Sequence, residues 1–257
     1  MSPSNRKPRE RLGRAAWLAE GLARDAAYVT IRQLGALGAR RRGAAAVGPD
    51  GTRVVRTTPA PPSARRPPAV VLIPGIYEPA AFMDPLRLWL EQRGHEVAIV
   101  EELGWNLRPL KESASLVAAR LEEVGIADAL VVAHSKGGLI GKELMVSHPR
   151  LAAGMVAAST PFAGHPYSRF APTPSLRAFN PALPALAALV REQSVNSRIV
   201  SVASAVDPVV SRGTQLEGAR NVRLPVVGHF RILGHPAFLE LLDGVLGEWN
   251  CWPVPDR

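Results

Sequence analysis

The sequence predicts an α/β fold, in which a doubly wound and mostly parallel sheet of about six strands carries helices on both faces. From residue 69 onward, short apolar runs alternate with stretches of helical periodicity, as parallel strands do with the crossover helices that join them. The chain has 257 residues, of which 47% are hydrophobic, so it can bury one large core. We therefore expect one main domain, at residues 69–257.

The expected strands and helices alternate along this domain. Strands are expected at residues 69–73, 96–100, 129–133, 154–158, 198–203 and 222–227, and helices at about 82–93, 110–124, 136–147 and 236–248. The connection at about residues 161–197 is longer than the others and combines prolines with apolar side chains. Because connections of this length are commonly functional, we expect a small apolar cap over a binding site. The alternative is a loop that only packs on the domain.

The N-terminal segment differs from the rest of the chain. An alanine-rich stretch at residues 12–39 predicts a helix, and its apolar face, with Leu18, Leu22 and Val29, is expected to pack on the domain. Residues 40–68 are rich in Arg, Gly and Pro, which is typical of a linker.

The formal net charge is +9, and much of the excess lies at residues 1–68. This basic segment can contact anionic membrane head groups, or it can simply keep the surface soluble, and both interpretations stay open. No nucleic-acid recognition motif accompanies the charge, so nucleic acid is not an expected partner. No run of 18 uncharged apolar residues and no signal-peptide pattern occurs, so we expect a cytoplasmic protein, with peripheral membrane association left open. The single cysteine, Cys251, excludes an intramolecular disulfide and a multi-thiolate metal site.

Ser135 is the candidate nucleophile. The expected strand at residues 129–133 leads through Ser135 directly into the expected helix at 136–147, and a serine in so sharp a turn projects from the edge of the sheet. Crowding in such a turn requires small residues two positions to either side, where the sequence has Ala133 and Gly137. The alternative is a serine that only caps the helix.

A serine hydroxyl needs an imidazole to accept its proton and a carboxylate to orient that imidazole. Asp207 and His229 each follow an expected strand, so both are expected at the carboxyl edge of the sheet, where active-site loops gather. His235, at the start of the last helix, is the less favoured candidate for the base. The alternative for Asp207 is a carboxylate that only stabilises a turn. Three other acidic residues are less suitably placed: Asp128, Asp243 and Glu217.

Acyl transfer also requires donors for the oxyanion of the tetrahedral intermediate. One is expected from the backbone amide of Lys136, directly after the nucleophile, and the other from Ile76, in the glycine turn after the first strand. Because only the amide of Lys136 is needed, its side chain is expected to face solvent.

Together these segments resemble the small bacterial lipases and esterases of the α/β-hydrolase superfamily. The resemblance spans about residues 69–245 and rests on Ile73-Pro74-Gly75-Ile76, Ala133-His134-Ser135-Lys136-Gly137-Gly138, Ser159-Thr160-Pro161-Phe162-Ala163-Gly164, Asp207 and Gly228-His229-Phe230. Many of those enzymes have His where this chain has Pro74. The resemblance implies hydrolysis of carboxylic esters without a metal or an organic cofactor, with Ser135, Asp207 and His229 as the catalytic triad.

The expected substrate-binding residues are Tyr77, Phe162 and Phe230. The apolar connection after Thr160 favours an acyl chain over a polar substrate, and so a lipid or a medium-chain ester. Two alternatives remain open: an acyltransferase or thioesterase with the same triad, and a non-catalytic module that binds lipid at a membrane.

Overall fold

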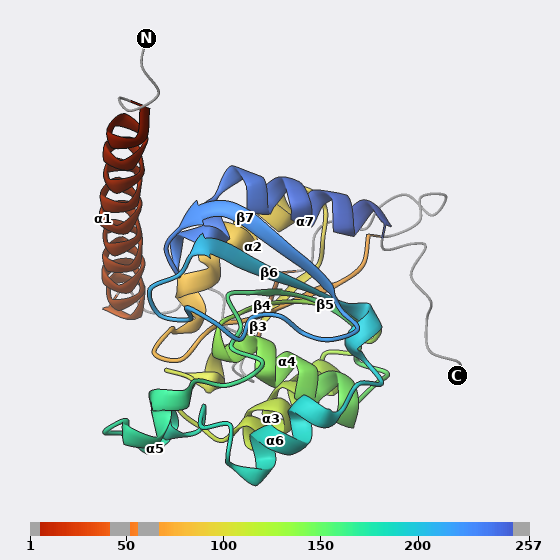
Figure 1. Ribbon diagram of the computed structural model, residues 1–257. Coiled ribbons are helices and arrows are strands. Elements are labelled where there is room, and N and C mark those ends of the chain that lie inside the picture. Colours follow the sequence, from red (N-terminus) through yellow and green to blue (C-terminus); the bar gives the residue numbers. More distant parts are fainter. Residues whose placement is uncertain (1–5, 42–51, 56–66, 249–257) are drawn as a thin grey trace.

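The computed structural model describes residues 6–41, 52–55 and 67–248 of the chain (Figure 1). Within these ranges, no helix combines the length and the apolar composition that a membrane span requires. Cys251 lies outside the described residues.

A seven-stranded sheet lies at the centre of the molecule, in the order β1-β3-β2-β4-β5-β6-β7. Six neighbouring strands run parallel: β2 (Val70–Ile73), β3 (Val97–Val100), β4 (Ala129–His134), β5 (Ala152–Ala158), β6 (Ile199–Val206) and β7 (Arg220–Val227). These strands coincide with the six expected from the sequence, apart from small shifts at their ends. The strand order changes direction at β2, so the loops after β2 and β4 separate there and leave room for a site at the carboxyl edge.

Helices cover both faces of the sheet (Figure 1). One face carries α2 (Asp84–Glu91) and α7 (Pro236–Glu248), and the other carries α3 (Leu110–Glu123), α4 (Lys136–Ser147) and α6 (Pro184–Arg191). The prediction of a doubly wound, mostly parallel α/β sheet is therefore confirmed.

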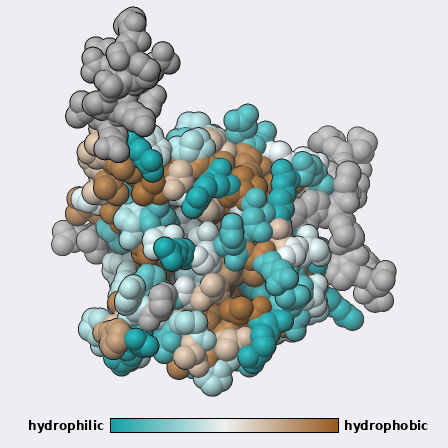
Figure 2. Space-filling model, in the orientation of Figure 1, coloured by the Kyte–Doolittle hydropathy of each residue, from teal (hydrophilic) through white to brown (hydrophobic). Residues whose placement is uncertain are grey.

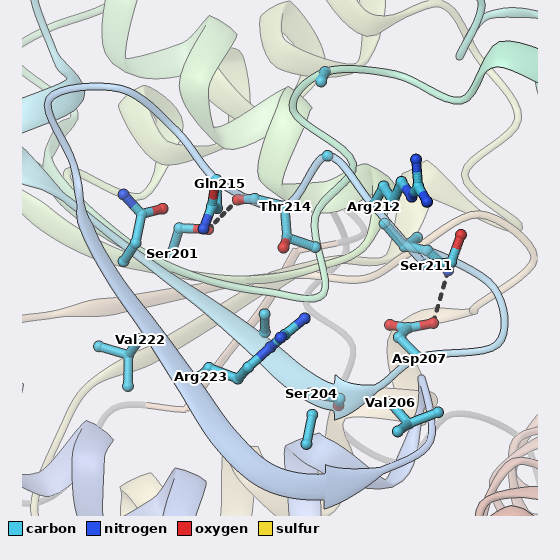
Figure 3. A pocket seen from close by; sticks show the side chains of 16 residues that line it. Ser201, Ser204, Val206, Asp207, Ser211, Arg212, Thr214, Gln215, Val222 and Arg223 are labelled. Carbon is cyan, nitrogen blue, oxygen red and sulfur yellow. Dashed lines mark hydrogen bonds between the residues drawn. The ribbon is translucent and has the colours of Figure 1, made fainter.

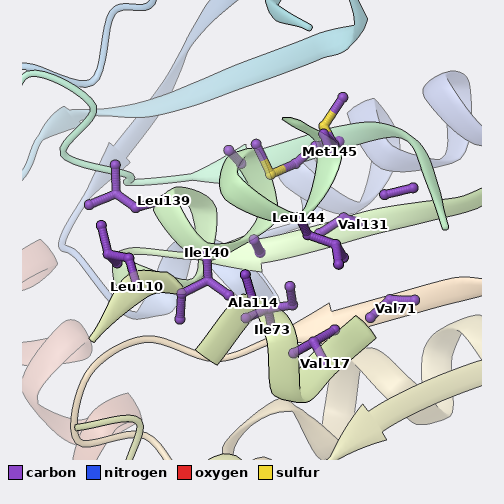
Figure 4. Close-up of a cluster of buried hydrophobic side chains, with 14 of the residues drawn as sticks. Val71, Ile73, Leu110, Ala114, Val117, Val131, Leu139, Ile140, Leu144 and Met145 are labelled. Carbon is purple, nitrogen blue, oxygen red and sulfur yellow. The ribbon is translucent and has the colours of Figure 1, made fainter. Parts of the chain in front are cut away.

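Each face of the sheet buries its own hydrophobic cluster. Val71 and Val131 point toward α3 and α4, where they pack with Ile140 (Figure 4). Val70 and Val132, one position away on the same strands, point toward α2 and α7. Because both faces are buried, these strands are continuous apolar runs rather than alternating ones.

The seventh strand, β1 (Thr52–Val55), lies in the segment that composition predicts as a linker. It pairs antiparallel with β3, with Thr52 opposite Val100 and Val55 opposite Val97. The linker prediction is therefore wrong for these four residues. They include two valines and a threonine, which favour strands, and they pair with the edge that β3 would otherwise expose.

The long connection between β5 and β6 contains four short helices: η4 (Pro166–Phe170), α5 (Pro174–Arg177), α6 and η5 (Asn196–Arg198). Other described 3₁₀ helices are η2 (Ala80–Met83), η3 (Glu101–Leu103) and η6 (Arg231–Gly234). Leu186 and Leu189 of α6 join the core beside α4, whereas Tyr167 and Phe170 of η4 are more than two-thirds exposed. One part of the connection thus packs on the domain, and another part projects from it.

A long N-terminal helix, α1 (Arg6–Arg41), packs beside the sheet against β7, η2 and η6 (Figure 1). Gly21 allows the closest approach, because a Cβ atom there would lie 2.3 Å from Cβ of Val227 in β7. No other residue type fits at this point unless the helix or the strand moves.

The packed face of α1 differs from the predicted one. Val29 lies against the core as expected, but Leu22 is 42% exposed. Figure 2 shows hydrophobic residues gathered on the surface of α1. Among the residues of α1 whose burial is described, the buried ones are Gly21, Asp25 and Ala36. Gly21 and Ala36 have no large apolar side chain and Asp25 is charged, so a pattern of large apolar residues does not reveal this face.

Candidate active site

Ser135 lies in a tight turn between β4 and α4. Its backbone has φ 50° and ψ −119°, a conformation that costs energy for a non-glycine residue and is found mainly at functional sites. Its side chain accepts no hydrogen bond from the first turn of α4, so Ser135 does not act as the helix cap. Gly137 is required here, because a Cβ atom would lie 2.2 Å from the carbonyl oxygen of Ile73.

Asp207 and His229 form a buried hydrogen-bonded pair at the carboxyl edge of the sheet. The distance between Asp207 Oδ2 and His229 Nδ1 is 2.8 Å. The other carboxylate oxygen of Asp207 accepts the N–H groups of Val209 and Val210 at 2.8 and 2.7 Å. Burial acts to raise the pKa of Asp207, but the hydrogen bond and charge of His229 and the two amides outweigh it and lower the pKa.

An ionised Asp207 can only accept a hydrogen bond, so Nδ1 of His229 carries the proton. In the neutral imidazole Nε2 then has a free lone pair and can act as a base. The His229 ring lies 4.8 Å from the ring of His134, the residue directly before Ser135.

The less favoured candidate residues lie elsewhere. Nδ1 of His235 accepts the N–H of Ala237 at the start of α7, as expected for a helix-entry residue. Asp243 pairs with Arg93, and Glu217 bonds Gln193.

Two backbone amides are free near Ser135. Among the described residues, no acceptor bonds the N–H of Ile76 or that of Lys136. The neighbouring Gly75 N–H, by contrast, donates to Glu78 Oε2 at 2.7 Å. The amides of Ile76 and Lys136 are therefore free to donate to a bound oxygen atom.

The side chain of Lys136 is buried, and the expectation that it faces solvent is wrong. Its ammonium group donates to the carbonyl oxygens of Asn106 at 2.7 Å and Arg108 at 2.6 Å. The Asn106 side chain in turn donates to the carbonyl oxygen of Pro74 at 2.7 Å. Burial lowers the pKa of Lys136 to about 8. The side chain thus links α4 to the loop that supports the Pro74-Gly75-Ile76 turn.

A second buried ion pair lies beneath the site. Glu78 and His134 are 1% and 0% exposed, and the distance from His134 Nδ1 to Glu78 Oε1 is 2.8 Å. The other ring nitrogen, Nε2, lies 2.9 Å from the carbonyl oxygen of His229. Because a carbonyl and a carboxylate both accept, both nitrogens of His134 donate and the ring is an imidazolium. Burial acts to lower the pKa of His134, but the charge and hydrogen bond of Glu78 more than offset it, so the pKa is raised.

A largely apolar cavity of about 270 Å³ opens beside Ser135. Ile76 contributes one wall, and the connection between β5 and β6 contributes most of the rest through Pro161, His165, Tyr167, Ser168, Ala171, Leu176 and Phe179. A larger cavity of about 700 Å³ lies on the far side of Asp207, between β6, β7 and the loop after Asp207 (Figure 3). Polar residues such as Ser201, Thr214 and Arg223 line it, and Ser135 does not. The smaller cavity is therefore the one available to a molecule that reacts at Ser135.

The three expected substrate-binding residues do not line the cavity beside Ser135. Phe162 is 2% exposed and belongs to the hydrophobic core. The Phe230 ring packs edge-on against His229, with their centroids 4.8 Å apart. The hydroxyl group of Tyr77 lies 3.3 Å from Oγ1 of Thr173, in the connection between β5 and β6, at the surface.

Sequence reasoning missed Glu78, His134 and Asp25 as parts of this site. Glu78 lies just after the Pro74-Gly75-Ile76 turn, and His134 lies directly before Ser135. Their places beside these two motifs are the sequence signal that could have identified them. No such signal marks Asp25, because the residue whose backbone N–H it accepts, His229, lies about 200 residues away in the sequence. Within the described residues, no three His, Cys, Asp or Glu side chains lie together in a way that could bind a metal ion.

Solved structures of the α/β-hydrolase fold are similar to this chain. The mature lipase BlEst2 of Bacillus licheniformis has a TM-score of 0.62 and 13% identity, covering 78% of this chain and 99% of its own. A structure from work on carboxylesterases of the Thaumarchaeon Nitrososphaera gargenis has a TM-score of 0.57 and 15% identity, covering 79% and 98%. An α/β hydrolase from the sediment metagenome of the Mar Chica lagoon, Morocco, has a TM-score of 0.56 and 14% identity, covering 80% and 98%.

No family model and no curated protein matches the sequence. The chain nevertheless has the α/β-hydrolase fold, as its resemblance to that superfamily implies.

The pair of Glu78 and His134 predicts a pH-dependent stability. A histidine whose pKa is raised on folding stabilises the protein fully below its unfolded pKa of about 6.5, and this contribution is lost as the pH rises through the folded pKa. We expect Glu78→Gln to lower the free energy of unfolding by about 3 kcal/mol near pH 6 and by clearly less at pH 9.

Urea denaturation at the two pH values measures this difference. The exposed Glu240 provides the control, since Glu240→Gln should leave stability unchanged at both. An equal loss for Glu78→Gln at pH 6 and pH 9 would contradict the imidazolium assignment.

Proposed function

We propose that this protein is a serine hydrolase that cleaves carboxylic esters, with Ser135 as nucleophile, His229 as general base and acid, and Asp207 as the residue that orients His229. The hydrogen bond between Asp207 and His229, at the same edge of the sheet as a strained Ser135, is the observation that carries the proposal. The α/β-hydrolase fold, which the chain shares with a lipase, supports it.

In the proposed mechanism, Nε2 of His229 takes the Ser135 hydroxyl proton as Oγ attacks the acyl carbon. The carbonyl oxygen becomes an oxyanion, which accepts hydrogen bonds from the amides of Ile76 and Lys136. Collapse of the intermediate expels the alcohol, which receives the proton from His229, and leaves an acyl-enzyme. Water then attacks the acyl carbon, again with His229 as base, and releases the acid and free Ser135.

The charges around His229 favour this cycle. Asp207 stays ionised and stabilises the imidazolium that forms after each proton transfer. Each preorganised amide at the oxyanion contributes about 3 to 4 kcal/mol in enzymes of this type. The partial positive charge at the N-terminus of α4 adds to their effect.

The cavity beside Ser135 supports an acyl substrate. Its walls expose mainly apolar atoms, including those of Leu176 and Phe179, and its volume of about 270 Å³ suits a chain of moderate length. We infer that medium-chain acyl esters are the substrates and that the cap residues contact the acyl chain. The cytoplasm is the proposed location, with peripheral membrane contact through the basic N-terminal segment.

The triad is tested by substitution and by covalent labelling. We expect a fluorophosphonate to label the wild-type protein at Ser135, and nitrophenyl esters to be hydrolysed. Ser135→Ala should abolish labelling and lower kcat by about 10⁶-fold. Asp207→Asn should lower kcat by about 10⁴-fold, because it leaves His229 in the wrong tautomer.

The control is Asp243→Asn, which changes an exposed carboxylate in α7 and should not affect kcat. Addition of alcohol or thiol acceptors shows whether the acyl group passes to water or to another acceptor. A protein that does not react with the fluorophosphonate, and that binds liposomes equally with and without Ser135, is a binding module and not an enzyme.

The acyl cavity is tested by filling it. Ala171→Phe adds a ring to the cavity wall and should lower kcat/KM for octanoyl esters by about 10- to 100-fold, since lost apolar contacts and clashes of this size cost about 1 to 3 kcal/mol. Acetyl esters should change little. Ala182→Phe, an exposed position in the same connection, is the control. Equal losses for short and long esters would exclude the cavity as the acyl site.

A further inference from the structure

Asp25, in the N-terminal helix, bonds the backbone of the loop that carries His229. Its Oδ2 atom accepts the N–H of His229 at 3.0 Å, and its Oδ1 atom accepts the N–H groups of Phe230 and Arg231, each at 2.8 Å. The side chain is only 5% exposed. One buried carboxylate thus satisfies three successive amides of a segment about 200 residues away in the sequence.

The surrounding residues leave little room for Asp25 to move. Gly228, directly before His229, has φ 132°, and a Cβ atom there would lie 2.4 Å from Oδ1 of Asp25. One turn earlier in α1, Gly21 packs against Val227, the last residue of β7. Two glycines, one on each side of the contact, are therefore needed to bring the carboxylate to the loop.

The contacts of Asp25 complete the set that fixes His229. Asp25 accepts the N–H of this residue, and His134 donates to its carbonyl oxygen at 2.9 Å. The peptide groups on both sides of its Cα atom are thus bonded to buried charged groups. With the backbone of His229 held on both sides, only its side-chain torsions are left free, and the hydrogen bond to Asp207 fixes these by holding the ring.

We propose that Asp25 is a positioning residue for His229, and that α1 is therefore a functional part of the active site rather than an appended basic segment. The proposal rests on the role proposed above for His229 as the base. A shift of the loop of about 1 Å would move Nε2 relative to Ser135, and displacements of this size can cost about 100-fold in rate. The effect should appear in kcat, because Asp25 lies outside the cavity that receives the acyl chain.

The test uses the full chain with Asp25→Asn. The amide has the shape of the carboxylate and retains one oxygen, which can still accept from Phe230 and Arg231. Its NH₂ group then faces the N–H of His229, so two donors meet. The matched control is Glu20→Gln, the same chemical change on the same helix, at an exposed residue that pairs with Arg24.

We expect Asp25→Asn to lower kcat for nitrophenyl esters by about 10- to 100-fold, with KM within about twofold of the wild type and a matching loss in the rate of fluorophosphonate labelling. Glu20→Gln should retain wild-type values. Unchanged kcat in a folded Asp25→Asn protein would overturn the proposal.

A second pair of variants applies if Asp25→Asn does not fold. Gly21→Ala retains the carboxylate but pushes α1 away from β7, and it should lower kcat with unchanged KM. Gly35→Ala, where a Cβ atom meets nothing within 4 Å, is its control and should not affect kcat. Wild-type kcat in Gly21→Ala would also count against the proposal.

NMR separates this proposal from the function itself. The chemical shifts of the Nδ1 proton and of the carbon-bound ring protons of His229 report the geometry of the loop without any turnover. We expect Asp25→Asn to shift both, and Glu20→Gln to shift neither. A wild-type protein without esterase activity would refute the proposed function. The spectra of Asp25→Asn would still show whether Asp25 positions His229. If they match those of the wild type, Asp25 does not position this residue.

Discussion

The hydrogen bond between Asp207 and His229 is the interaction on which the rest of the site depends. It is short, at 2.8 Å, and both residues are buried, so water does not weaken it. It holds the proton on Nδ1 and leaves Nε2 with a free lone pair, as the role proposed for His229 requires. Against the effect of burial, the hydrogen bond and charge of His229, together with the amides of Val210 and Val209, keep Asp207 ionised, which makes this tautomer the stable one.

The sheet brings these residues together because all of them follow parallel strands. Ser135 follows β4, Asp207 follows β6 and His229 follows β7, so the three loops meet at one edge. Buried charges then bond the loops to one another. Glu78 accepts from Gly75 and from His134, and His134 donates to the backbone of His229, so one ion pair joins the loops after β2, β4 and β7.

Local sequence patterns predict the parts of this site that depend on neighbouring residues. The apolar strands and small residues around Ser135 predict the turn, and Asp207 and His229 are predicted at the same edge because each follows a strand. The Lys136 side chain is mispredicted, since its acceptors are carbonyl groups about 30 residues away. Asp25 looks like any charged residue of a surface helix. Burial of a charge depends on distant partners, and one sequence does not reveal them. The short strand β1 is missed for a similar reason, because only β3 makes those four residues a strand.

A crystal structure of the fluorophosphonate adduct tests the proposed site most directly. We expect phosphorus bonded to Ser135 Oγ, one phosphonyl oxygen within hydrogen-bond distance of the amides of Ile76 and Lys136, and Nε2 of His229 beside Oγ while Nδ1 still bonds Asp207. The alkyl chain of the reagent should occupy the cavity lined by Leu176 and Phe179. Phosphorus on another residue, or an oxygen that faces solvent with His229 turned away, would contradict the account.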